Sequence, residues 1–272
     1  MKKEIPQVST LTFLKNAAQI VKNPLPFHRE NFSKHGDIFR LNIGPKKSVI
    51  FCRDAEFAKY VLQKNQKNYI KSEIQTKDLV KYVGNGLLTS NGEHWQKQRK
   101  LIQPAFHKKH IANLLNTVLE AIRVEYLKIR PDKTIDVYPV FNDLAFQTVV
   151  KSLFSSAASQ EEINRLQFVT EANQKMLVKE LRQPYKHLWF NISGKLKHHL
   201  KLSEESRQIL RNIVNKRKQN PKRYDDLLDM LLDARYEDGQ PMSEEQLIDE
   251  ILILFVAGHE TTSNSLSFTT QL

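Results

Sequence analysis

The stretch that decides the fold is Ile251-Leu-Ile-Leu-Phe-Val-Ala-Gly-His-Glu-Thr-Thr-Ser263, close to the end of the chain. It begins with six bulky apolar residues and then becomes small and polar, with no proline to end a helix. Upstream, Ser243-Glu-Glu-Gln246 is a capping box, which predicts that a helix begins near Met242 and continues through the apolar segment. Because its middle is apolar on nearly all sides, we expect this helix to be buried in a sizeable protein.

The second half of this helix predicts a groove lined by small residues. Ala257, Thr261 and Ser265 recur every four residues and share one face, with Gly258 beside them. A threonine hydroxyl can bond back to the carbonyl oxygen four residues earlier, and Glu260 adds a carboxylate. These residues alone leave two interpretations open. One is a small-ligand pocket with proton delivery, and the other is a close helix crossing that uses Gly258 and Ala257.

The composition of the 272 residues, with 40% hydrophobic and 26% charged side chains, is that of an ordinary globular protein. The single cysteine, Cys52, excludes an internal disulfide framework and a cysteine-cluster metal site, and it fits a reducing, cytoplasmic setting. The first residues lack the apolar region of a signal peptide, and the longest apolar run is far shorter than the roughly 20 residues of a membrane span. The net charge of +12 is spread along the chain outside any nucleic-acid-binding motif, so we expect no nucleic-acid partner.

A small sheet is predicted near the start of the chain. Residues 36–44 alternate between polar and apolar side chains, and residues 48–52 form a second apolar run, so the two should pair as a hairpin with a turn at 44–47. Asp54 is suited to cap the helix that follows. Two further expectations are a weak helix over 11–21, ended by Pro24 and Pro26, and a long loop over 66–77.

From residue 113 onward the apolar period predicts helices almost throughout. The expected helices cover residues 112–130, 141–153, 163–181, 204–219 and 225–236. The expected breaks lie at Pro131, Pro184, Pro221 and Gly239-Gln-Pro241. The basic run Lys195–Leu202 is interpreted as the end of a surface helix. The fold class is therefore mainly α, a helical bundle with a small N-terminal β-sheet.

A second candidate site lies on a short helix that ends near Ile102. Ser90-Asn-Gly-Glu93 is a further capping box and is expected to begin this helix. Trp95 and Arg99 are four residues apart and so share one face, with His94 near its edge. An indole N–H beside a guanidinium forms a pair of donors suited to a carboxylate. The alternative is an ordinary amphipathic helix on which the tryptophan packs and the arginine pairs with a surface acid.

Both sites resemble segments of one family. The C-helix region of cytochrome P450 monooxygenases closely resembles Gly84-Asn-Gly-Leu-Leu-Thr-Ser-Asn-Gly-Glu-His-Trp-Gln-Lys-Gln-Arg-Lys-Leu-Ile-Gln-Pro-Ala-Phe106. The oxygen-binding I-helix signature of the family resembles Ala257-Gly-His-Glu-Thr-Thr262. Residues 225–233 and 238–243 resemble the family's segments that lead into that helix. The resemblance covers nearly the whole chain in the right order and implies the cytochrome P450 fold.

The resemblance implies a haem b cofactor and a monooxygenase that inserts one atom of dioxygen into a small, apolar organic substrate. The implied site residues are Trp95, Arg99 and His94 at the haem propionates, Ala257 and Gly258 at the dioxygen groove, and Thr261 and Glu260 as the catalytic proton donors. His259 is at the variable position of the signature and receives no ligand role. Residues 69–87 and 168–188 would border the substrate pocket.

The expected electron donor is a ferredoxin, a flavodoxin or a reductase. We expect its docking patch among four lysines in and after the Trp95 helix, namely Lys97, Lys100, Lys108 and Lys109. No membrane-spanning segment is expected to take part, because no apolar run is long enough.

The resemblance also implies an axial cysteine and a Glu-x-x-Arg pair, both after the I-helix. The chain ends at Leu272, and Cys52 lies far upstream, so we expect no metal ligand in this chain. Three earlier Glu-x-x-Arg matches are expected to be ordinary i,i+3 surface pairs: Glu120/Arg123, Glu162/Arg165 and Glu204/Arg207. We therefore expect residues 1–272 to be a single incomplete P450 domain that is inactive alone. The alternative is a non-catalytic helical scaffold or binding protein derived from that fold.

Overall fold

The computed structural model describes residues 4–44, 47–130, 132–183, 186–220 and 222–270. The expected turn at residues 45–46, the expected helix breaks at Pro131, Pro184 and Pro221, and the final residue Leu272 lie outside these ranges. The contacts within the chain divide it into two compact units, residues 1–70 and 71–272, each of which is described by itself.

The first unit contains the predicted sheet, with the strand order β1 (Gln7–Val8), β2 (Ile38–Asn42) and β3 (Ser48–Cys52). β1 is parallel to β2, whereas β2 and β3 are antiparallel, with Phe39 opposite Phe51. The predicted hairpin is therefore confirmed. The alternation in β2 buries Phe39 and Leu41, which form a small core with Val8 and Phe27.

The helices of the first unit are α1 (Thr10–Lys22), α2 (Leu25–His35) and α3 (Ala55–Lys59), followed by a π-helical turn (Tyr60–Lys64) and a 3₁₀ turn (Gln66–Asn68). α1 confirms the predicted helix, but α2 was not expected. Pro24 is the N-cap of α2 and Pro26 lies in its first turn, where the missing proline N–H would have no helical partner anyway. The two prolines therefore begin a helix here. Asp54 caps α3 as predicted, since its Oδ1 accepts the Phe57 N–H at 2.6 Å.

The second unit is helical. Its elements are a π-helical segment (Ile74–Leu79), α4 (Val80–Val83), α5 (Gly92–Ile102), a 3₁₀ turn (Gln103–Phe106), α6 (Lys108–Asn113), α7 (Leu115–Tyr126), α8 (Val137–Phe154), α9 (Gln160–Arg182), α10 (His187–Ile192), α11 (Lys195–Gln219), α12 (Leu227–Asp233) and α13 (Glu244–Thr269). The helix predicted over 112–130 is present in its central part as α7, whereas residues 112–113 belong to the separate helix α6. The expected loop over 66–77 contains short helical turns. α11 begins at Lys195, which places the basic run at a helix end as predicted.

The predicted helix over 225–236 is shorter at both ends, and its start at residue 227 has a physical reason. Asp226 is the N-cap of α12, and its Oδ1 accepts the Asp229 N–H at 3.0 Å. The same two carboxylates bind the buried Arg217 of α11, with one guanidinium nitrogen 2.7 Å from an oxygen of each. Because a buried charge is costly unless it is paired, this ion cluster determines where α12 begins and ties it to α11.

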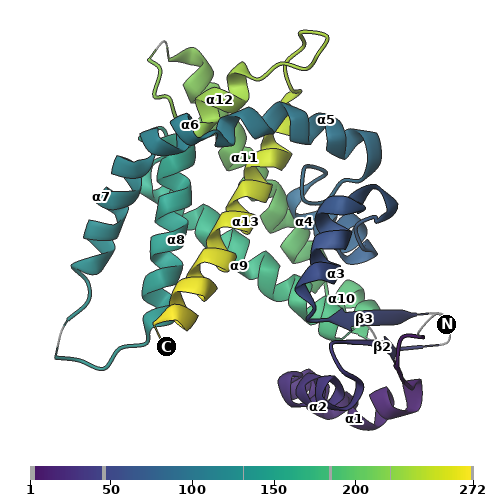
Figure 1. The fold of residues 1–272 in the computed structure, drawn as a ribbon. Coiled ribbons are helices and arrows are strands. Elements are labelled where there is room, and N and C mark those ends of the chain that lie inside the picture. Colours follow the sequence, from purple (N-terminus) through teal and green to yellow (C-terminus); the bar gives the residue numbers. More distant parts are fainter. Residues whose placement is uncertain (1–3, 45–46, 131, 184–185, 221, 271–272) are drawn as a thin grey trace. The chain divides into compact units, whose positions relative to one another are not determined.

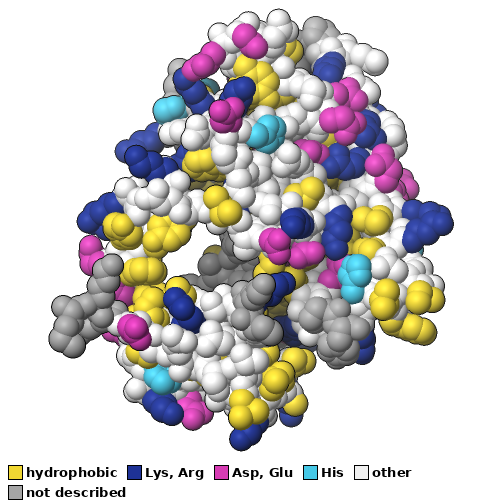
Figure 2. All heavy atoms as spheres, turned by 90° about the vertical axis from the view of Figure 1, so that its right-hand side faces the viewer, with side chains coloured by type: hydrophobic (Ala, Val, Ile, Leu, Met, Phe, Trp, Pro, Cys, Tyr) yellow, Lys and Arg dark blue, Asp and Glu magenta, His cyan; other side chains and the backbone are white. Residues whose placement is uncertain are grey.

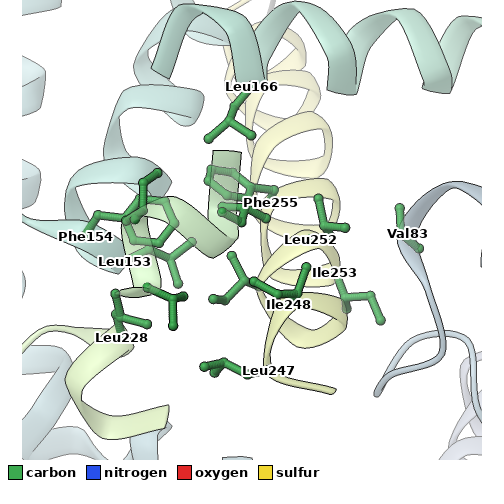
Figure 3. Packing of buried hydrophobic residues seen from close by; sticks show 14 of the residues in the cluster. Val83, Leu153, Phe154, Leu166, Leu228, Leu247, Ile248, Leu252, Ile253 and Phe255 are labelled. Carbon is green, nitrogen blue, oxygen red and sulfur yellow. The ribbon is translucent and has the colours of Figure 1, made fainter. Parts of the chain in front are cut away.

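The core of the second unit is built around α13, which packs along α8 (Figure 1). Figure 3 shows Ile248 and Phe255 of α13 on the side of Leu153 and Phe154 of α8, whereas Leu252 lies toward Val83, and all of these residues belong to one buried cluster. Phe255 stacks on Phe146 with ring centroids 5.7 Å apart. The prediction of a buried helix over the apolar segment is therefore confirmed.

Two of the three Glu-x-x-Arg matches do not form the expected i,i+3 ion pair, because their acids and bases bind other residues. Glu162 of α9 pairs with Lys216 of α11 at 2.9 Å, and Glu204 pairs with Arg211 at 2.9 Å. Arg165 of α9 bonds to Glu205 of α11, with Nη2 2.7 Å from Oε2. Because α9 packs against α11, several of these side chains reach across to a partner on the neighbouring helix.

Positive and negative side chains are interspersed over the face drawn in Figure 2. The net charge of +12 is therefore not gathered into one field of a single sign on that face. Within the described ranges, none of the helices combines the length and the apolar composition that crossing a bilayer requires.

Candidate functional site

The start of α13 keeps one half of the predicted capping box. Ser243 Oγ accepts the Gln246 N–H at 3.2 Å, as expected. The prediction that the Gln246 side chain also bonds to the Ser243 N–H is wrong. The Gln246 amide instead donates to Glu250 Oε1 at 2.9 Å and to the Asn85 carbonyl oxygen at 3.2 Å. The side chain turns away because the loop before α5 lies beside it and offers an acceptor.

The second half of α13 presents a face of small side chains whose hydroxyls bond to the helix backbone. Thr261 Oγ1 donates to the Ala257 carbonyl oxygen at 2.6 Å, which is the back-bond that the sequence predicted. Further hydroxyls behave alike, with Ser265 donating to Thr261 at 2.9 Å and Thr269 donating to Ser265 at 2.8 Å. Ala257, Thr261 and Ser265 are all exposed, and so is Glu260. This face is therefore open, with a hydroxyl and a carboxylate next to each other in the chain.

Gly258 faces a different direction from Ala257. A Cβ atom at Gly258 would lie 2.7 Å from Cγ2 of Val149 on α8, which is closer than real Cβ contacts. The glycine thus permits the close crossing of α13 and α8, as one of the two interpretations proposed. Ala257 is exposed and takes no part in that crossing. The close-crossing interpretation therefore holds at Gly258, and the small-ligand interpretation stays a prediction for the open face.

His259 lies between these faces and is 1% exposed. Its ring stands edge-on to Phe146 with centroids 5.2 Å apart, and neither ring nitrogen has a hydrogen bond of ordinary geometry within the described part of the chain. Burial lowers the pKa of His259, which favours the neutral ring. A cleft of about 410 Å³ between α8, α9 and α13 is lined by His259, Glu260, Asn142 and Glu171. Glu260 therefore borders this cleft as well as the open face of α13.

The segments expected to border a substrate meet at another point of α13. Tyr82 and Val83 from the first segment and Val169 from the second line a crevice together with Leu252 and Val256 of α13. The free volume of this crevice is about 20 Å³, room for about one water molecule. The crevice is mostly apolar but closed.

The predicted capping box at the start of α5 is wrong. α5 begins at Gly92 and its N-cap is Asn91, whose side chain caps nothing on the helix. Instead, Asn91 Oδ1 accepts the backbone N–H of Lys71 at 2.9 Å. Ser90 Oγ is buried without a hydrogen-bond partner in the described ranges. The start of α5 is thus held by the preceding segment and not by its own side chains.

Trp95 and Arg99 lie side by side, as the spacing predicted, with the guanidinium carbon of Arg99 5.3 Å from the Trp95 ring centroid. Arg99 is exposed, and among the described residues neither its guanidinium nor the Trp95 indole N–H has a hydrogen-bond acceptor or an ion-pair partner. His94 differs, because its Nε2 lies 3.1 Å from the Asn85 carbonyl oxygen. Two free donors on one helix face fit an anionic carboxylate such as a haem propionate.

The loop between Gly84 and Asn91 is fixed to the first turns of α13 by residues that sequence reasoning missed. Asp249 Oδ2 accepts the Asn85 N–H at 2.7 Å, and Glu250 Oε2 accepts the Leu87 N–H at 3.0 Å. A Cβ at Gly86 would lie 2.7 Å from the Glu250 carboxyl carbon, so only glycine allows this approach. The adjacent acids Asp249 and Glu250, between apolar residues of the helix, were the feature of the sequence that could have predicted this contact.

Burial raises the pKa of Glu250 to about 7, although the Leu87 N–H and the Gln246 amide favour its ionised form. Lys71 approaches from the other side of the loop, and burial lowers the pKa of its ammonium group. The expected effect is a buried carboxyl that gains and loses its proton near neutral pH.

In the part of the chain that the structure describes, this loop carries the polar contacts between the regions of the two candidate sites. Glu250 precedes Ala257 by seven residues, which is about 10 Å along a helix. Within the described ranges, no hydrogen bond or ion pair links Trp95 or Arg99 to Glu260 or Thr261.

Of the lysines expected at a docking patch, Lys97, Lys100 and Lys108 are exposed. Lys100 is paired with Glu237, and the Lys109 side chain is outside the described part of the chain. The patch stays a prediction.

Comparisons with known proteins show the family of this chain. The family model for Cytochrome P450 matches residues 6–270. Cyclooctat-9-en-7-ol 5-monooxygenase of Streptomyces melanosporofaciens is 26% identical over 257 residues, which cover 92% of this chain and 54% of that protein. Pentalenene oxygenase of Streptomyces avermitilis is 26% identical over 255 residues, which cover 93% of this chain and 56% of that protein.

Among solved structures, retinoic acid bound cyanobacterial CYP120A1 matches with a TM-score of 0.68 at 22% sequence identity. The match covers 90% of this chain and 54% of that one, and it shows a shared fold. The chain spans about half the length of the curated relatives it matches.

Proposed function

Because the chain belongs to the cytochrome P450 family, whose members use a haem iron cofactor, we propose that it provides the dioxygen-handling part of a haem monooxygenase. The complete activity would insert one atom of dioxygen into a small organic substrate. The observation that carries this proposal is the open face of α13, where the Thr261 hydroxyl is bonded to the Ala257 carbonyl oxygen beside an exposed Glu260.

Trp95 and Arg99 hold the haem propionates in this proposal. Their donors have no other acceptor in the described residues, so a carboxylate can bind without displacing an existing bond. His94 is a weaker contributor, because one of its ring nitrogens already lies at the Asn85 carbonyl oxygen. The haem, when bound, supplies the redox chemistry that activates dioxygen.

Thr261 and Glu260 deliver protons. The Thr261 hydroxyl donates its only proton to the Ala257 carbonyl oxygen, while its lone pairs remain free to accept another. On rotating away from that carbonyl, Thr261 Oγ1 can pass its proton toward the open face and receive a replacement by way of the Glu260 carboxyl group, directly or through one water. Glu260 borders the 410 Å³ cleft and can regain its proton there from solvent.

The substrate class follows from the crevice and from the relatives. The walls contributed by Tyr82, Val169 and Leu252 favour an apolar molecule, which would have to part α9 from α13 to enter the closed crevice. The related enzymes are named for cyclooctat-9-en-7-ol and pentalenene, both small organic molecules. A ferredoxin, flavodoxin or reductase would supply electrons, docking on exposed lysines such as Lys97 and Lys108.

The test is the substitution Thr261→Ala in the haem-loaded monooxygenase. Without the hydroxyl, electrons should leave as hydrogen peroxide instead of appearing in product, so the fraction recovered as product should fall several-fold. Thr269→Ala is the matched control, because Thr269 makes the same kind of back-bond, at 2.8 Å, two turns later.

Unchanged coupling in Thr261→Ala would refute the proton-delivery role. The competing proposal, a non-catalytic scaffold of the same fold, would be favoured if haem added to a version that spans the full length of the relatives yields no thiolate-type absorption spectrum.

A further inference from the structure

Lys71 is a half-buried cation that the proposed reaction does not use. Its Nζ atom donates two hydrogen bonds of 2.7 Å, to the carbonyl oxygens of Leu87 and Ser90. Its own backbone N–H donates to Asn91 Oδ1 at 2.9 Å. Lys71 thus bonds to three residues of the loop that leads into α5, namely Leu87, Ser90 and Asn91.

The Leu87 peptide groups are held from two sides. The Leu87 carbonyl oxygen accepts from Lys71, and the Leu87 N–H donates to Glu250 Oε2 of α13 at 3.0 Å. Lys71 and Glu250 also attract each other. A loop fixed by a cation on one side and a carboxyl group on the other has little freedom to shift.

Lys71 also reaches the site itself. Its Nζ atom lies 5.5 Å from the centroid of the Trp95 ring, over whose face Arg99 is also placed, at 5.3 Å. A cation within about 6 Å of an indole centroid is attracted to the ring. Because the N-cap side chain of α5 makes no capping bond, Lys71 is the main polar anchor of the helix start.

From these contacts we propose that Lys71 is a positioning residue for the anion site of α5. Acting with Glu250 through the Leu87 peptide groups, it fixes the loop so that the Trp95 indole and the Arg99 guanidinium point their donors at one carboxylate. This inference rests on the proposed haem role of Trp95 and Arg99 and adds the residue that preorganises them.

The first test needs no haem. In Lys71→Met, which keeps the length of the side chain but not its charge, hydrogen–deuterium exchange of peptides covering residues 84–95 should rise about tenfold, since hydrogen bonds to a charged donor are lost. Lys71→Arg should restore most of the protection. Lys77→Met is the matched control, because Lys77 is an exposed lysine that bonds only to Glu73 among the described residues.

The second test measures the site. Residues 1–272 contain two tryptophans, so Trp189→Phe leaves Trp95 as their single tryptophan, and haem binding is followed by quenching of its selectively excited emission. Lys71→Met should weaken haem binding about tenfold, Lys71→Arg by about twofold or less, and Lys77→Met not at all. Circular dichroism of each variant verifies that the helices are retained.

The outcomes separate the inference from the function on which it rests. If Arg99→Ala weakens haem binding and Lys71→Met does not, the positioning role is overturned and the haem role of Arg99 stands. If Arg99→Ala has no effect, the proposed haem role fails and the inference falls with it. If Lys71→Met raises exchange throughout the chain as strongly as in residues 84–95, Lys71 is a general stability residue and the inference is wrong.

Discussion

The two halves of α13 differ in what surrounds them, although they form one continuous helix. Up to Phe255 the helix is buried among the apolar side chains of α8, and its acids Asp249 and Glu250 are bonded to the loop before α5. From Ala257 onward one side still packs on α8 through Gly258, while the opposite side carries the small, exposed side chains of Ala257, Thr261 and Ser265. One helix thus combines a half that supports the fold with a half that is available for chemistry. Substitutions in the two halves should therefore have opposite profiles, on stability in the first and on reaction outcome in the second.

The largest expected effect is in the buried half. Phe255→Ala removes a ring that packs on Phe146 and Phe154, so the free energy of unfolding should fall by about 3–5 kcal/mol. Urea unfolding followed by circular dichroism measures this change. Phe268→Ala is the matched control in the open half, because Phe268 is 69% exposed and its loss should change stability by less than about 0.5 kcal/mol. Equal losses for the two variants would contradict the contrast between the halves.

The next effect depends on pH. Glu250 is 1% exposed, and burial raises its pKa from 4.5 to about 7. The folded chain therefore holds this proton more tightly than the unfolded chain. The contribution of Glu250 to stability is largest below about pH 4.5 and falls as the pH rises to about 7, by on the order of 3 kcal/mol.

Glu250→Gln should remove this loss, because the amide oxygen still accepts the Leu87 N–H while no charge is buried. The variant should be more stable than the parent chain at pH 8 and nearly equal to it at pH 4.5, as measured by thermal unfolding at both values. Glu260→Gln, an exposed substitution in the open half, should change stability by less than about 0.5 kcal/mol. If the parent chain were more stable than Glu250→Gln at pH 8, the prediction would be wrong.

A smaller effect is expected where the halves meet. Gly258→Ala should gain about 1 kcal/mol of helix propensity but lose about 1–3 kcal/mol through the clash with Val149, for a modest net loss. Val149→Ala should remove the clash, so the double variant should be more stable than the sum of the single changes. A double-mutant cycle measures this coupling, and additive changes would show that the crossing is looser than the structure indicates.

Local chemistry explains what the sequence could predict. The buried helix, the hairpin, the Asp54 cap and the Thr261 back-bond all depend on residues within a few positions of each other, and each is present. The pairing of Trp95 with Arg99 is local in the same sense. These features follow from periodicity and from the donors that each side chain carries.

The features that were missed depend on partners distant in the chain. Ser90 does not cap α5 because Lys71 and Asn91 hold that region, and Gln246 leaves its capping role for a loop more than 150 residues away. The acid–base pairs of α9 and α11 follow helix packing and not i,i+3 spacing. A single sequence read for local period contains no information about which distant element will lie beside a polar group.

The hydroxyls of Thr261, Ser265 and Thr269 on the open half are turned back onto the helix, and this makes its surface conditional. At rest, Thr261 and Ser265 direct their protons at carbonyl oxygens and present mainly carbon to the outside. Each can expose a donor by a single bond rotation, which takes picoseconds to nanoseconds and costs about the 1 kcal/mol of the bond that is given up. The same face can therefore tolerate an apolar guest in one moment and supply a proton in the next, without any movement of the backbone.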